Sequence, residues 1–165
     1  YFDPRRSRQS FSLLLKRLSD PVEKQYAVSL KEAFKHVGQA AQTGSLVYII
    51  SDFMQLDSDL QQRADIDHLV KRCDVVFIAI NDVADQMIFP MGNLAFCGRN
   101  EEKFHVDTLH EVGRETYGKQ WNENRERLYA LASGLKIPLI ELTTQSNIRK
   151  DLVLELKRLA ARKRR

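Results

Sequence analysis

Acidic and hydroxyl-bearing residues stand at the ends of three apolar runs in this sequence. They are Asp52, Asp82 and the pair Thr143 and Thr144, with Asp57 and Asp59 shortly after the first run. If the runs are parallel strands, these residues share the carboxyl rim of one sheet, where open α/β proteins bind ligands. Their oxygens suit a hard cation such as Mg²⁺, although one or two carboxylates do not complete its ligand shell. Asp52 is equally suited to cap a loop or the following helix.

The three apolar runs predict the strands that carry this rim. Residues 46–50, 75–80 and 137–142 are short and apolar, and the first two favour strands buried on both faces. An amphipathic pattern from Leu60 to about Cys73 predicts a helix between the first two strands. Strand, helix and strand in this order form a βαβ unit with parallel strands. The predicted fold class is therefore α/β, with a parallel, Rossmann-like sheet flanked by helices.

Helix-start signals and turn residues predict the elements around the sheet. Phe11 to Leu18 has the apolar spacing of a short amphipathic helix. The start signals of later helices are Asp20-Pro21-x-Glu23, Ser29-x-x-Glu32, Asp57-Ser58-Asp59, Thr108-x-x-Glu111 and Ser146. Between the second and third strands, two short apolar segments around a polar loop predict a β-hairpin near 94–106.

Other chemical signals are weak. The sequence has no G-x-S-x-G nucleophile motif and no glycine-rich phosphate loop. His105, Asp107 and His110 lie close together, but we favour surface groups of the hairpin over a metal cluster. Cys73 and Cys97 lack metal-ligand spacing, which favours small buried side chains in a reducing, cytoplasmic compartment.

Composition limits the class of protein. The chain has 165 residues, 43% of them hydrophobic and 29% charged, which suits one globular domain over 1–165. No apolar run reaches the length of a membrane span. The net charge of +4 owes much to a basic C-terminal end, for which we expect no nucleic-acid partner because no aromatic interleaving supports one. The chain does not begin with Met, and we expect it to be a piece of a longer protein.

Several short motifs, taken in order, point to a family. They are G-S-L-V-Y-I-I-S-D-F at 44–53, V-V-F-I-A-I-N-D-V at 75–83, Phe89-Pro90 with Gly92, and Arg114-x-x-Tyr117. This order resembles the bacterial family called domain of unknown function fifty-eight, over essentially the whole chain. The family is related to von Willebrand factor A domains, whose sheet carries a metal-ion-dependent adhesion site.

The resemblance implies a partial metal site. Asp52 matches the aspartate that follows the fourth strand of the adhesion site, and Ser29 matches its loop serine or threonine, while remaining equally a capping residue. The main ligand motif D-x-S-x-S is absent, and Asp82-Val83-Ala84-Asp85 departs from the family's D-P-x-E. We therefore expect the C-terminal part of a von Willebrand factor A-like domain, with its first strands upstream. Mg²⁺ or another divalent cation is expected in the full-length protein and none in this fragment.

The resemblance also implies a function. We expect a non-enzymatic adaptor that binds a protein partner, a MoxR-type AAA+ ATPase, in protein assembly or maturation. The alternative is a Mg²⁺-dependent phosphoester hydrolase or nuclease that uses Asp52 and Asp82. Without a neighbouring strand, residues 46–50 would expose an apolar edge, which predicts a dimer or another association through that strand.

Overall fold

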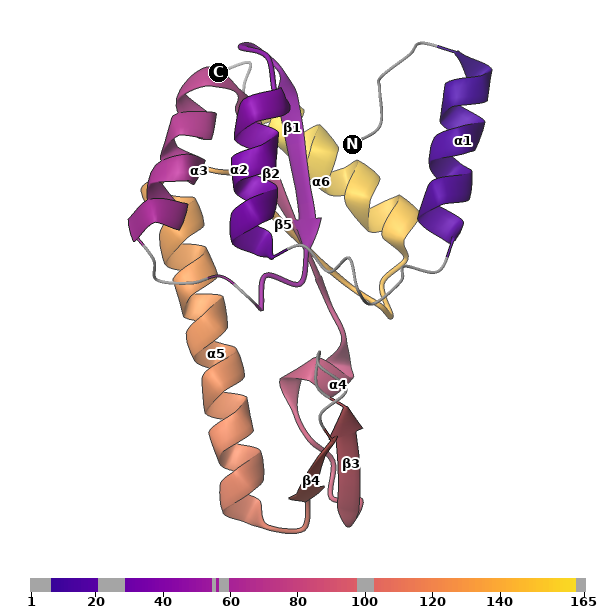
Figure 1. Cartoon of the computed structure of the whole chain (residues 1–165), viewed down its shortest axis with the longest axis vertical. Helices are drawn as coiled ribbons and strands as arrows, with labels where there is room; N and C mark the ends of the chain where they lie inside the picture. Colours follow the sequence, from indigo (N-terminus) through magenta and orange to yellow (C-terminus); the bar gives the residue numbers. More distant parts are fainter. Residues whose placement is uncertain (1–6, 21–28, 55, 57–59, 98–102, 163–165) are drawn as a thin grey trace.

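The computed structural model describes residues 7–20, 29–54, 56, 60–97 and 103–162 and confirms the α/β fold class (Figure 1). The helices are α1 (Arg8–Ser19), α2 (Leu30–Ala40), α3 (Leu60–Arg72), α4 (Val83–Gln86), α5 (Glu111–Gly134) and α6 (Ile148–Arg162). The strands are β1 (Leu46–Ser51), β2 (Asp74–Asn81), β3 (Asn93–Cys97), β4 (Lys103–Asp107) and β5 (Leu139–Thr143). The helix starts predicted at Asp20-Pro21 and Asp57–Asp59 involve residues outside the described part.

The main sheet is parallel and three-stranded, in the order β1-β2-β5. Its central strand β2 aligns Val75 with Val47 of β1, and Ile78 with Ile140 of β5. Strands β3 and β4 form a separate antiparallel pair, which confirms the predicted hairpin. In Figure 1 the hairpin lies beyond the carboxyl ends of the main strands, and the long α5 runs from it back along the sheet. The carboxyl rim therefore lies between the sheet and the hairpin.

One face of the sheet carries the larger core. Helices α2, α3 and α5 cover it, and their buried side chains include Phe34, Ile66, Leu69, Leu128 and Leu131. Phe77 of β2 is 0% exposed, and its ring centroid lies 6.1 Å from that of Phe34 and 5.0 Å from that of Phe53. Cys73 is buried beside this core, as predicted, and its thiol donates to the Gln42 carbonyl. The Cys97 side chain is outside the described part.

Helix α6 covers the opposite face only in part. Leu152, Leu156 and Leu159 of α6 pack against buried residues of β2 and β5. On β1, the side chains of Leu46, Tyr48 and Ile50 alternate onto this same face and are 54%, 44% and 61% exposed. The prediction that residues 46–50 are buried on both faces is therefore wrong, whereas β2 is buried on both. The reason is position: β1 ends the described sheet, and no described element covers it there.

Two predicted helix caps differ in the structure. Thr108 does not cap α5, because its hydroxyl donates to the Gly92 carbonyl and accepts from the Met91 N–H at the base of the hairpin. Ser146 does not cap α6 either, because its hydroxyl bonds to Thr143. The side chain of Asn147 instead accepts from the Lys150 N–H in the first turn of α6. In both cases a residue at the end of a strand or next to it competes for the hydroxyl.

Helix α1 confirms the predicted N-terminal helix, but it buries none of its residues. Its side chains Phe11, Leu14 and Leu18 are 62%, 40% and 74% exposed. No helix in the described part of the chain combines the length and apolar character that crossing a bilayer requires.

Candidate functional site at the carboxyl rim of the sheet

The turn after β1 holds Asp52 at the rim. The Asp52 carboxylate accepts from the Met54 N–H at 3.1 Å and the Ser51 hydroxyl at 3.3 Å, and the Phe53 N–H donates to the Ser51 oxygen at 3.1 Å. Phe53 has a φ of 57°, which L-residues adopt rarely, and its ring is buried against Phe77. Burial of the Phe53 ring compensates the backbone strain at this residue. The neighbouring Asp52 side chain is exposed to solvent.

The rim residues of β2 and β5 meet, as the sequence predicted. The Thr144 hydroxyl donates to the Asp82 carboxylate at 2.8 Å, and the Ala84 N–H donates to its other oxygen at 2.8 Å. The Ala84 N–H and then the Thr144 hydroxyl stabilise the charged form, which lowers the pKa of Asp82 below its ordinary value. Asp82 also caps the single turn of α4. The described contacts do not join Asp82 to Asp52.

Ser29 is the N-cap residue of α2, and Asp52 directly follows β1. Figure 1 shows α2 beginning beside the carboxyl end of β1 and running back along the strand. The Ser29 hydroxyl accepts from the Glu32 N–H at 3.2 Å, and the Glu32 carboxylate accepts from the Ser29 N–H at 3.2 Å, which confirms the capping box. The backbone N–H of Ser29 stabilises the charged form of the Glu32 carboxylate and therefore lowers the pKa of Glu32. A role of Ser29 and Asp52 in binding a metal remains a prediction.

The donor chemistry at the rim fits a hard cation, but the set of donors is incomplete. Asp52 and Ser29 provide one carboxylate and one hydroxyl, and both already make local hydrogen bonds. Within the part of the chain that is described, no three His, Cys, Asp or Glu side chains group as metal ligands. In the hairpin, His110 and Asp107 form an exposed pair at 3.4 Å. The rim therefore offers only Asp52 and Ser29, which make up part of a ligand set for a metal ion.

One residue under the rim escaped the sequence reasoning. Arg125 of α5 is 5% exposed and donates from Nη2 to the backbone carbonyl of Asp52 at 3.1 Å. Its guanidinium carbon lies 5.2 Å from the centroid of the Trp121 ring. The sequence did contain a signal for the burial of Arg125. Position 125 falls four residues after Trp121 and three before Leu128, on the apolar stripe of α5.

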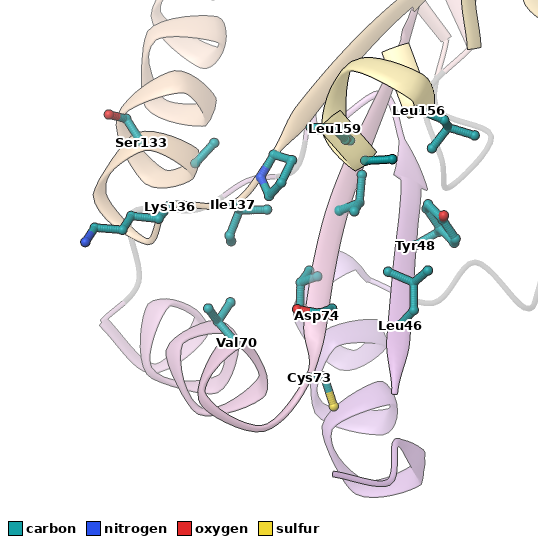
Figure 2. Close-up of a pocket in the computed structure, with 15 residues that line it drawn as sticks. Leu46, Tyr48, Val70, Cys73, Asp74, Ser133, Lys136, Ile137, Leu156 and Leu159 are labelled. Atoms are coloured by element: carbon teal, nitrogen blue, oxygen red, sulfur yellow. The ribbon is translucent and has the colours of Figure 1, made fainter. Parts of the chain in front are cut away.

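A cavity lies at the opposite end of the sheet from the rim. It has a volume of about 740 Å³, and Leu46 and Tyr48 of β1 and Leu156 and Leu159 of α6 line one side of it (Figure 2). Its lining is mainly apolar and does not include the rim carboxylates. The cavity therefore belongs with the exposed face of β1, and we do not assign the rim chemistry to it.

Comparisons with known proteins identify one relationship. A family model described as "Protein of unknown function DUF58" matches residues 1–127. No curated protein and no solved structure matches the chain.

Proposed function

The chain belongs to the DUF58 family of proteins of unknown function, and on this basis we propose that it is a non-enzymatic protein-interaction module. The observation that carries the proposal is the open edge of β1. Among the described strands, β1 pairs only with β2, so the peptide groups on its other side are available to a further strand. Pairing at a sheet edge is a common way for one polypeptide to bind another.

The exposed face of β1 adds an apolar contact to this edge. Leu46, Tyr48 and Ile50 point to one side of the sheet, and the first two continue into the cavity under α6. Contiguous apolar surface beside an unpaired strand is typical of binding sites, because both features are costly to leave in water. A polar surface strand would support no such proposal.

For the isolated chain, we propose that a second copy of the chain binds to the open edge of β1. A two-fold axis perpendicular to the sheet would pair the two β1 strands antiparallel, which gives each copy the same contacts. The three exposed side chains of each β1 would then lie on the same face and form cross-strand pairs. The edge is thus self-complementary without any change in the described fold.

In the cell, we propose a MoxR-type AAA+ ATPase as partner, in protein assembly or maturation in the cytoplasm. The support for this partner is the family resemblance alone. A Mg²⁺-dependent phosphoester hydrolase is the rival function, and no described contact brings its two carboxylates, Asp52 and Asp82, together. A Mg²⁺-dependent cleavage of bis(p-nitrophenyl) phosphate that disappears in Asp52→Ala would favour this rival.

Sedimentation and light scattering over a dilution series test the proposed edge. We expect a concentration-dependent dimer in the wild-type chain. Ile50→Lys should weaken it by about tenfold or more, because a lysine on a sheet edge opposes strand pairing. Leu154→Lys is the matched control, since Leu154 is 46% exposed on α6 and is not part of β1. A wild-type chain that stays monomeric at every concentration, or an Ile50→Lys chain that dimerises normally, would refute the proposed contact.

A further inference from the structure

The guanidinium of Arg125 is buried and makes one hydrogen bond with another described residue. Arg125 is 5% exposed, and the bond runs from Nη2 to the Asp52 carbonyl. The Nε and Nη1 atoms are shielded from solvent and have no hydrogen-bond partner among the described residues. Buried donors of a charged group are normally satisfied, because leaving them unpaired forfeits the hydration they lose. These two donors therefore require an acceptor that the described residues do not provide.

The positive charge of Arg125 also has no counter-charge among the described residues. Arginine stays charged, and burying a charge is unfavourable unless an opposite charge accompanies it. None of the ion pairs in the described part of the chain includes Arg125. Asp52 offers it a neutral backbone carbonyl, while its carboxylate bonds within its own turn. The Trp121 ring offers a cation–π contact, which does not neutralise the charge.

The location is the ligand-binding end of a parallel sheet. Arg125 contacts the turn that follows β1. At the carboxyl end of β2, Asn81 is 6% exposed, and its Oδ1 is a further buried polar atom without a partner among the described residues. Ligands of open α/β folds enter at this end of the strands. Buried polar atoms without partners in that region indicate that a polar ligand belongs there.

We propose that Arg125 binds an oxyanion, the carboxylate or phosphate group of a ligand, beside the Asp52 carbonyl and the Trp121 ring. Guanidinium donors match the planar spacing of carboxylate and phosphate oxygens and form charge-assisted hydrogen bonds with them. The buried setting strengthens these bonds, because little water competes for either partner. Arg125 bonds the turn after β1 and not the strand itself, so this site does not use the peptide groups of the proposed dimer edge.

Trp121 is a built-in reporter for this site. It is the single tryptophan of the chain, is half-buried, and lies against the guanidinium. An anion that pairs with Arg125 changes the charge next to the indole ring and therefore its emission. The experiment titrates the whole chain with sodium phosphate or sodium acetate, and with sodium chloride at equal ionic strength, while emission and melting temperature are recorded.

We expect a saturable change in Trp121 emission and a rise in melting temperature with phosphate or acetate, but not with chloride. If phosphate binds more tightly, the group that Arg125 binds in the natural ligand is a phosphoryl group. If acetate binds more tightly, that group is a carboxylate, such as an acidic side chain. Arg125→Lys should lower the affinity by about tenfold or more because it loses the planar donors. Arg125→Met should abolish the response. Arg127→Met is the matched control, since Arg127 is on the same helix, 45% exposed, and paired with Glu123.

Two results would overturn the proposal. The first is a wild-type chain that shows no saturable response to phosphate and acetate, or one that chloride reproduces. The second is a response that persists in Arg125→Met or, if that variant does not fold, at full strength in Arg125→Lys.

Discussion

Replacing Ser29 by Ala separates the capping role of this residue from its predicted metal role. The variant loses the hydroxyl that accepts from the Glu32 N–H at 3.2 Å and donates to the Glu32 carboxylate at 3.1 Å. The Ser29 backbone N–H keeps its bond to Glu32. Loss of a serine N-cap costs about 1 kcal/mol, within a range of roughly 0.5–2 kcal/mol. For a chain of this size, that lowers the melting temperature by about 2–4 °C.

Thermal and denaturant unfolding followed by circular dichroism measure this loss. Ser29→Asp is the first control and should unfold like the wild type, because aspartate is an equally good N-cap. Ser7→Ala is the second control, since Ser7 caps α1 by the same bond to the Ser10 N–H. Helix α1 buries no residue, whereas α2 buries Phe34 in the core. We therefore expect Ser7→Ala to leave the main unfolding transition unchanged.

Repeating the unfolding series with Mg²⁺ in the full-length protein, where the cation is expected, tests the metal role. If Ser29 acts only as a cap, Mg²⁺ changes the stability of the wild type and of Ser29→Ala by the same amount. If Ser29 is also a ligand, Mg²⁺ stabilises the wild type more than the variant, in proportion to its lost affinity. A Ser29→Ala chain as stable as the wild type would refute the capping argument, and so would an equal loss in Ser7→Ala.

Two further predictions concern the rim and the core. Asp82→Asn should lower the melting temperature at neutral pH, because the folded pKa of Asp82 lies below its unfolded value. The stabilisation is complete above the unfolded pKa and is lost as the pH falls through the folded one, so the two melting temperatures should converge in acid. A difference that stays constant down to the lowest measurable pH would contradict this linkage. Phe77→Ala should cost about 3–5 kcal/mol in denaturant unfolding, because Phe77 is fully buried between two aromatic rings. Its control Phe11→Ala, 62% exposed on α1, should change stability by less than about 0.5 kcal/mol, and equal losses in the two variants would contradict the assigned core.

Local sequence patterns predicted most elements of the fold. The apolar runs at 46–50 and 75–80 lie within strands β1 and β2, and the run at 137–142 overlaps most of β5. The capping box at Ser29 forms, because both partners belong to the same four residues. The contact of Asp82 with Thr144 also follows from the pattern, since neighbouring parallel strands end on one rim. These features depend on spacing along the chain.

Other features depend on which segments meet in space, and the sequence predicted them wrongly or not at all. Thr108 has the spacing of a helix cap, but its hydroxyl bonds to Gly92 of the hairpin. Leu46, Tyr48 and Ile50 look like a buried strand, but their exposure depends on how far α6 reaches across the sheet. Neither outcome is encoded within a window of a few residues, because the competing partner is distant in the chain.

Taken by itself, the sequence determined the α/β class, the strand ends that bear Asp52 and Asp82, and the capping role of Ser29, because hydrophobic period and short-range hydrogen bonds suffice for each. Only the tertiary structure decided that one face of β1 is exposed, with Leu46, Tyr48 and Ile50 on it, and that Arg125 is buried beneath the Asp52 turn. Burial is a property of packed surfaces, and an arginine on an apolar stripe acquires its unpaired charge only when its helix docks against the sheet.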